Sequence, residues 1–186
     1  MQSPTINGSL DSFLRRSDIE GSPAWEFVDG QAIQKVGPTL FHSLVQLNLM
    51  NAINERANEY EALQELRCIV SPFSAVPDIS VIAIDRISEE DGPFIGSPDW
   101  IIEILLPEDS KLTLQTKALH LLGKGAALVW LIDIQQQQIW VWQREDLPQV
   151  HSGDDNLPTL DIFTCLTVKD VMSMTQRRQK GSSFNV

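Results

Sequence analysis

The chain has 186 residues, of which 42% are hydrophobic and 21% are charged, and its formal net charge is −11. These proportions are ordinary for a soluble globular protein, and the length is sufficient for one domain with a sizeable core. The acidic balance argues against a protein that coats nucleic acid through a general basic surface. It does not exclude an enzyme that contacts phosphates through a metal and a few lysines.

The N-terminus and the two cysteines indicate the cellular compartment. Residues 1–9 are polar and contain no apolar segment of the kind found in signal peptides. No apolar run approaches the roughly 18 residues that span a membrane. Cys68 and Cys165 lie far apart without metal-ligand spacing, so we expect both to be reduced core residues. We therefore expect a cytoplasmic protein without a membrane partner.

The N-terminal part of the chain predicts a tail, a short helix and a hairpin. Residues 1–8 are expected to form a loose polar tail, followed by a helix over residues 9–16 that Ser9 caps. The Asp29-Gly30 pair suits a two-residue turn between strands, so the runs on either side of it predict a β-hairpin. The two hairpin strands are residues 25–28 and 31–35.

The longest predicted helix covers residues 40–58, with Thr39 as its expected N-cap. Residues 59–65 are expected to be a loop or the frayed end of this helix. Two apolar strands follow, residues 66–70 and 76–84, and we expect them to pair with each other in antiparallel fashion. The apolar residues that recur at helical spacing are Leu40, Leu44, Leu47, Ala52 and Ile53.

The C-terminal half predicts a strand–helix–strand unit. Residues 100–106 are almost continuously apolar, as expected for a central strand that is covered on both faces. A helix over residues 112–122 and a strand over residues 127–133 complete the unit, which should be a right-handed parallel crossover. The other expected elements are an acidic surface loop (85–97), a hairpin partner strand (138–142), a loop-rich stretch (144–165), a short helix (167–172) capped by Thr167, and a polar tail (176–186).

This order of elements predicts an α/β (α+β) fold, in which a mixed β-sheet is flanked by helices and preceded by an N-terminal β-hairpin. The sequence contains no internal repeat and no sign of a second domain. We therefore expect residues 1–186 to form a single domain with a core of about residues 10–172.

Two acidic residues stand in apolar strands, where a soluble core would exclude them. Asp78 opens the strand at residues 76–84, and Glu103 lies inside the strand at residues 100–106. A carboxylate in such a run costs several kcal/mol unless something pairs with it. Oxygen ligands suit a divalent metal, and a metal activates water for attack on phosphodiesters. The two acids therefore predict a shared metal site.

Five segments of the chain, in this order, resemble a widespread bacterial family described as restriction endonucleases. That family was formerly a domain of unknown function and belongs to the PD-(D/E)XK nuclease superfamily. The resemblance covers roughly residues 10–170. It implies a restriction-endonuclease-like core, magnesium with manganese as a substitute, and hydrolysis of DNA phosphodiesters. The segments are residues 25–31, His42, residues 77–81, residues 100–105 and residues 130–133.

The resemblance also implies roles for individual residues. Asp78 looks like the first metal-binding acid, and Glu103 looks like the acid of the second half-motif. Glu26 looks like an additional acid from the N-terminal part, and His42 stands at the start of a helix. We take these four residues as candidate catalytic residues, with Asp78 and Glu103 as candidate metal ligands.

The chain departs from the superfamily pattern at the lysine that usually follows two residues after the second acid, because that position is Leu105 here. Many members of the family lack this lysine and recruit one from the following helix. Lys117 aligns with that migrated lysine and completes the candidate catalytic set. Lys111, which is nearer in sequence, is the alternative.

The predicted function is a magnesium-dependent DNA endonuclease, in which Lys117 or Lys111 stabilises charge beside the metal. Duplex-cutting nucleases often work as dimers, and an exposed apolar hairpin around residues 139–142 would offer a surface, so we expect a homodimer. Two alternatives stay open. The chain could be a catalytically degenerate nuclease fold that serves as a binding or assembly module, or a metal-dependent hydrolase of a small phosphorylated substrate.

Overall fold

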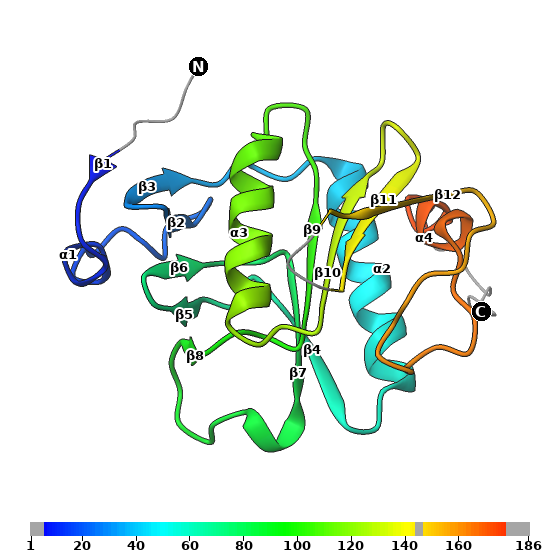
Figure 1. Ribbon diagram of the computed structural model, residues 1–186, viewed down its shortest axis with the longest axis horizontal. Coiled ribbons are helices and arrows are strands. Elements are labelled where there is room, and N and C mark those ends of the chain that lie inside the picture. Colours follow the sequence, from blue (N-terminus) through cyan, green and yellow to red (C-terminus); the bar gives the residue numbers. More distant parts are fainter. Residues whose placement is uncertain (1–5, 144–146, 178–186) are drawn as a thin grey trace.

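The computed structural model describes residues 6–143 and 147–177. Across those residues the strands form two mixed sheets of six strands each, with helices packed on them (Figure 1). The first sheet, in the order β1-β3-β2-β6-β5-β8, contains β1 (Ile6–Asn7), β2 (Trp25–Val28), β3 (Gln31–Gln34), β5 (Cys68–Val70), β6 (Phe73–Ala75) and β8 (Phe94–Ile95). The second sheet, in the order β12-β11-β10-β9-β7-β4, contains β4 (Tyr60–Gln64), β7 (Ile79–Ala83), β9 (Trp100–Ile104), β10 (Leu128–Asp133), β11 (Gln138–Trp142) and β12 (Gln149–Ser152). The helices are α1 (Leu10–Leu14), α2 (Leu40–Arg56), α3 (Lys111–Gly123) and α4 (Val168–Ser173), with a 3₁₀ turn at Ile84–Arg86.

The predicted fold class is confirmed, although the strands divide into two sheets rather than one. The predicted strand–helix–strand unit is present, because β9 and β10 pair in parallel and α3 connects them. The predicted hairpin is also present as β2 and β3, which turn at Asp29 and Gly30. Both turn residues have positive φ, as a tight hairpin turn of this kind requires.

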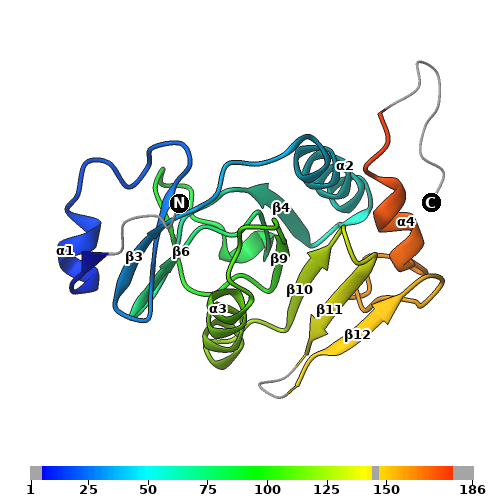
Figure 2. The ribbon, with the colours of Figure 1, turned by 90° about the horizontal axis from the view of Figure 1, so that it is seen from above.

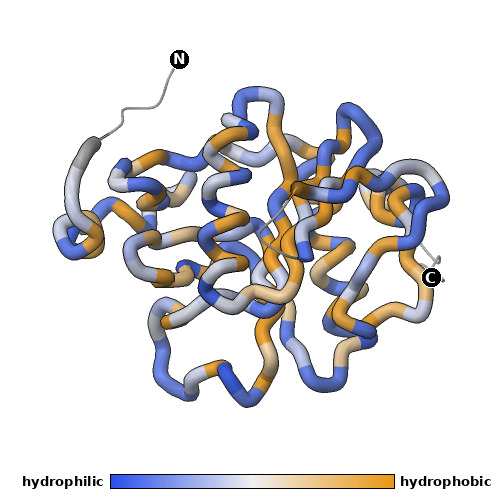
Figure 3. The backbone as a smooth tube through the Cα atoms, viewed as in Figure 1, coloured by the Kyte–Doolittle hydropathy of each residue, from blue (hydrophilic) through white to orange (hydrophobic). Residues whose placement is uncertain are grey.

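The side chains of the central strand β9 alternate between two helices. Trp100, Ile102 and Ile104 belong to a core that includes α2, whereas Ile101 packs in a second core with α3. Figure 2 shows α2 and α3 on opposite faces of the second sheet. Because strand side chains alternate with a period of two, Glu103 lies on the α3 face. The hydrophobic segments accordingly gather along the central strands, while the outer loops are mostly hydrophilic (Figure 3).

Helix α2 begins after Thr39, as predicted, but it buries a different face from the predicted one. The Thr39 side chain accepts a hydrogen bond from the backbone N–H of His42, which is the expected N-cap. Leu40 and Leu47 are 57% and 46% exposed, so the predicted leucine stripe faces outward in part. Contact with the second sheet selects the opposite stripe, which contains both polar and apolar residues. The buried residues of α2 are His42, Val45, Gln46, Asn48, Leu49 and Ile53.

Two segments that the sequence predicts as loops form strands at the edges of the second sheet. Residues predicted as loops form β4, which pairs with β7, and β12, which pairs with β11. The predicted pairing of the strands at residues 66–70 and 76–84 is wrong, because β5 pairs with β6 and β7 lies in the other sheet. Part of the predicted tail at residues 1–8 forms β1, while residues 1–5 of that tail and 178–186 of the C-terminal tail lie outside the described residues. Edge strands bury only part of one face, so their sequences lack the apolar signal of β9.

Two surface expectations are corrected. Ile139, Val141 and Trp142 are buried, because the first two pack in the core that includes α2 and Trp142 packs in the core with α3, so these residues do not present the predicted apolar surface for a dimer. Cys68 is buried as predicted, whereas Cys165 is exposed rather than in the core. Among the described residues, no helix is long and apolar enough to cross a membrane.

Candidate active site

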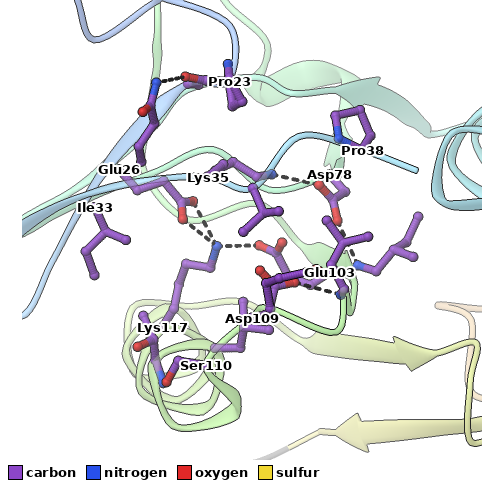
Figure 4. A pocket seen from close by; sticks show the side chains of 18 of the residues that line it. Pro23, Glu26, Ile33, Lys35, Pro38, Asp78, Glu103, Asp109, Ser110 and Lys117 are labelled. Atoms are coloured by element: carbon purple, nitrogen blue, oxygen red, sulfur yellow. Dashed lines mark hydrogen bonds and ion pairs between the residues drawn. The ribbon is translucent and has the colours of Figure 1, made fainter. Parts of the chain in front are cut away.

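A pocket of about 760 Å³ opens where the hairpin, the start of α2, the entry into β7, the end of β9 and helix α3 meet. The side chains at its centre are charged, and Figure 4 shows them converging from these separate elements. Lys117 rises from α3 between Glu26 and Glu103, and Lys35 points toward Asp78 (Figure 4). The two lysines therefore divide the charged centre into two halves.

In the first half, one amine is shared between two carboxylates. Lys117 Nζ donates hydrogen bonds to Glu26 Oε1 at 2.8 Å and Oε2 at 3.0 Å, and it lies 2.7 Å from Glu103 Oε1. All three side chains are buried, and that of Lys117 is only 2% exposed. Glu26 reaches this position because Trp25 and Phe27, on either side of it in β2, pack against α1 on the opposite face. We call Glu26, Glu103 and Lys117 the Lys117 half.

Burial and charge act against each other in the Lys117 half. Burial disfavours the charged form of Glu103 and raises its pKa to about 7, because Lys117 and Lys35 offset only part of that cost. Burial alone would lower the pKa of Lys117, but Glu103 and Glu26 outweigh it and hold the pKa above its ordinary value. The amine therefore stays charged, and it stabilises the ionised form of the carboxylates beside it.

In the second half, one carboxylate accepts from three donors. Asp78 Oδ1 accepts a hydrogen bond from Lys35 Nζ at 2.7 Å. Asp78 Oδ2 accepts one from the backbone N–H of Ile104 at 2.7 Å and lies 3.1 Å from His42 Nε2. Gln46, one turn after His42 on α2, donates to the backbone carbonyl of Asp78 at 2.8 Å. We call Lys35, Asp78 and His42 the Asp78 half.

The donors around Asp78 keep it ionised in spite of its burial. Burial alone would raise the pKa of Asp78, but Lys35 and His42 hold it well below the usual range of an aspartate. Lys35 is also largely enclosed, which by itself would lower its pKa, and Asp78 together with Glu103 and Glu26 raises that pKa above its ordinary value. The pocket thus holds a buried carboxylate that is fixed in both charge and orientation.

The five residues predicted from the sequence all line this pocket. The structure distinguishes the two lysines that the sequence left as alternatives. Lys111 forms an ion pair with Asp133 at 3.4 Å, and its amine lies over the ring of Trp140. Lys117 is therefore the lysine that lies beside the predicted acids. The roles assigned to the five residues stay predictions. They are Glu26, His42, Asp78, Glu103 and Lys117.

Sequence reasoning missed Lys35, although a signal for it was present. In the hairpin register Glu26 pairs with Ile33, and the backbone N–H of Lys35 donates to the carbonyl of Ala24. Residues 33 and 35 therefore lie on the same face of the hairpin as Glu26. Reading the turn at Asp29-Gly30 through to the ends of both strands would have placed a lysine beside the acids.

The donor set of the pocket is compatible with magnesium. No three His, Cys, Asp or Glu side chains within residues 6–143 and 147–177 gather closely enough to hold a metal by themselves. Magnesium does not require such a group, because it keeps several waters and is usually bound through one or two carboxylates. Asp78 and Glu103 supply two carboxylates in one pocket, and Glu103 Oε1 lies 2.7 Å from the ammonium of Lys117. These carboxylate oxygens are hard ligands of the kind that magnesium prefers.

Known proteins resemble the chain in both sequence and structure. The sequence pattern of the Uma2 family, described as "Putative restriction endonuclease", matches residues 10–169. Among solved structures, the chain is similar to a crystal structure of "a putative nuclease belonging to DUF820" from Anabaena variabilis. The two are 33% identical, the match covers 91% of this chain and 99% of that chain, and the TM-score is 0.83. A comparison with curated proteins gives no match.

Proposed function

The chain belongs to the Uma2 family, and from that premise we propose that it is a metal-dependent endonuclease that hydrolyses phosphodiester bonds of DNA. The observation that carries the proposal is the meeting of Asp78, Glu103 and Lys117 in one pocket, from three elements that are distant in sequence. Two acids and a lysine are the groups that phosphodiester hydrolysis with a metal requires.

Each charged residue of the pocket has a task in this reaction. Asp78 and Glu103 would hold Mg²⁺, or Mn²⁺ as a substitute. A bound metal of this kind lowers the pKa of a coordinated water and neutralises charge on the phosphate. Lys117 places a permanent positive charge beside Glu103, where negative charge develops on the phosphate oxygens. His42 orients the Asp78 carboxylate through Nε2, and Glu26 holds the Lys117 amine in place.

Lys117 also accounts for the leucine at the usual lysine position. Leu105 packs against the apolar core under α3, on the side of β9 to which Glu103 belongs. Lys117 enters from α3 on that same side. The helix therefore supplies an amine on the side of β9 where a lysine at position 105 would lie. This arrangement supports a catalytically active site rather than a degenerate one.

The charge of the pocket favours a reaction that depends on a divalent cation. Six acids line the pocket, whereas the lysines that line it are Lys35 and Lys117. Without a cation this lining repels the DNA backbone, because like charges at short range are unfavourable. We therefore expect DNA to bind the pocket only together with the metal. The six acids are Glu26, Glu65, Asp78, Glu103, Glu108 and Asp109.

The proposed function is tested by plasmid cleavage with isosteric variants. We expect the wild-type protein to nick and linearise supercoiled DNA in Mg²⁺ or Mn²⁺ and to be inactive in EDTA. Asp78→Asn and Glu103→Gln should abolish cleavage, because each keeps its shape and loses a carboxylate. Asp154→Asn is the matched control, since that side chain is 86% exposed. Cleavage by both acid variants at the wild-type rate would overturn the proposal.

The second candidate function is a nuclease fold that binds or assembles without cleaving. It is favoured by the ion pairs themselves, since Lys35 and Lys117 already neutralise the carboxylates that a metal would need. This candidate predicts that calorimetry detects no Mg²⁺ or Mn²⁺ binding that Asp78→Asn removes.

We also propose that cleavage of both strands uses a homodimer, which light scattering at the concentration of the cleavage assay would detect.

A further inference from the structure

The amine of Lys35 makes two contacts, one with a carboxylate and one with a backbone carbonyl. Lys35 Nζ donates to Asp78 Oδ1 at 2.7 Å and to the backbone carbonyl of Val76 at 2.7 Å. The side chain follows directly after strand β3 and is 17% exposed, against 2% for Lys117. Lys35 therefore lies closer to the opening of the pocket than the other site lysine does.

The two oxygens of Asp78 are held in different ways. Oδ2 is fixed by the protein framework, through the backbone N–H of Ile104 in β9 and the ring of His42 in α2. The contact of Oδ1 with the described residues is the flexible amine of Lys35. A divalent cation at Oδ1 would repel the ammonium of Lys35 that lies 2.7 Å from this oxygen, while Oδ2 and its two donors keep the carboxylate in place.

Resting on the proposed function, we infer that Lys35 is an exchangeable counterion. It neutralises Asp78 while the metal is absent, a divalent cation displaces it from Oδ1, and the freed amine then binds a phosphate group of the substrate. No bond is made or broken in this exchange. Lys35 is thus a metal-regulating and phosphate-binding residue of the site.

Lys117 does not have this freedom. Its amine is bonded to Glu26 and lies against Glu103, so one contact survives when the other is taken. Its side chain is also buried on the inner face of α3, where its displacement would leave an empty polar space. Lys35 has one carboxylate partner and a flexible four-carbon stem near the opening of the pocket, so the energetic cost of moving it is smaller.

The exchange couples metal binding to phosphate binding. Three carboxylates, of Glu26, Asp78 and Glu103, face the two lysines. A divalent cation that occupies Asp78 Oδ1 takes away the carboxylate partner of Lys35. A phosphodiester of the substrate carries a negative charge that can replace this partner. Each ligand should therefore strengthen the binding of the other, and linkage requires the two effects to be equal.

The first test measures Mn²⁺ affinity by titration calorimetry with no DNA present. Lys35→Met should bind Mn²⁺ about tenfold more tightly than wild type, because it removes the competing charge. Lys35→Gln should behave in the same way, and Lys35→Arg should stay near wild type. Lys111→Met is the matched control, because it removes the same charge from a lysine paired with Asp133 outside the pocket. Thermal unfolding verifies that each variant is folded.

The second test adds dimethyl phosphate, a phosphodiester monoanion too inert to be hydrolysed during a titration. At matched ionic strength it should tighten Mn²⁺ binding to wild type clearly more than to Lys35→Met. An equal effect on both proteins would overturn the transfer of Lys35 to phosphate.

The inference on metal binding is overturned if both uncharged variants bind Mn²⁺ no more tightly than wild type. Its failure is separable from that of the proposed function. Tighter Mn²⁺ binding in a protein that does not cut DNA overturns the function alone. Cleavage that depends on Asp78, with Mn²⁺ affinity unaffected by Lys35, overturns the inference alone.

Discussion

The two halves of the site balance acids and donors differently. In the Lys117 half, the amine of Lys117 serves Glu26 and Glu103, and Glu26 also accepts from the backbone N–H of Val76, so two donors serve two acids. In the Asp78 half, the single carboxylate accepts from Lys35, His42 and the backbone of Ile104, so donors outnumber the acid. Glu103 therefore depends on Lys117, whereas Asp78 keeps two donors when Lys35 is removed. This difference makes the second half the place where charge can be exchanged.

The largest effect is expected from Lys117→Met, which leaves two buried carboxylates without a cation. Removing one partner of a buried ion pair costs about 3–5 kcal/mol, so the free energy of unfolding should fall by about that amount. Urea denaturation followed by circular dichroism measures it. Lys111→Met is the control, and it should cost about 1 kcal/mol or less because its pair is partly exposed.

A second variant shows whether charge is the cause. Adding Glu26→Gln to Lys117→Met removes one of the two stranded charges and should restore part of the lost stability. If Lys117→Met is no more destabilising than Lys111→Met, the contrast between the halves fails.

Asp78→Asn should have the next largest effect on stability. The amide can still accept from the backbone of Ile104, but Lys35 loses its carboxylate partner. Hydrogen bonds to charged groups contribute about 1.5–3 kcal/mol, so a loss of about 2–3 kcal/mol in the free energy of unfolding is expected. The same denaturation experiment measures it, and Asp154→Asn should be unchanged. A loss larger than that of Lys117→Met would reverse the ranking of the two halves.

Lys35→Met should destabilise the protein less than either of these changes. Asp78 keeps His42 and the backbone N–H of Ile104, so no carboxylate is left without a donor. We expect the free energy of unfolding to fall by about 1–2 kcal/mol. Direct comparison of Lys35→Met with Lys117→Met in one urea series tests the asymmetry, which is contradicted if the two losses are equal.

The smallest effect is expected from Gln46→Leu. Gln46 donates one hydrogen bond to the backbone carbonyl of Asp78 and carries no charge. Its loss should cost about 0.5–1.5 kcal/mol, as for an ordinary hydrogen bond. Thermal unfolding measures the change, and Gln138, at the start of strand β11 and outside the pocket, offers Gln138→Leu as a comparison. A cost as large as that of Asp78→Asn would mean that Gln46, rather than Lys35, fixes the Asp78 half.

Local chemistry made much of the fold predictable. Asp29-Gly30 specifies its hairpin, and Thr39 and Thr167 cap their helices, because these effects act within a few residues along the chain. The apolar run of β9 marks a central strand, because a strand covered on both faces has no polar side. The edge strands β4 and β12 escaped detection because only part of one face is buried.

The choice between the two helix lysines shows what local patterns leave undecided. Lys111 and Lys117 are six residues apart, which corresponds to about 240° around an α-helix. They therefore point in different directions, and the way α3 packs on the sheets decides which of them meets the acids. The sequence names both candidates, but it contains no measure of how the helix is rotated on the sheet.

The sequence by itself determined the two acids, the strands that carry them and the order of the family's motifs, because each is set by neighbours in the chain. Only the tertiary structure decided that Lys117 binds Glu26 across 91 residues and that Lys35 binds Asp78 across 43. Such pairs depend on how two sheets and a helix pack together. The balance of acids and donors in the site, two donors for two acids in one half and three donors for one acid in the other, follows from that packing.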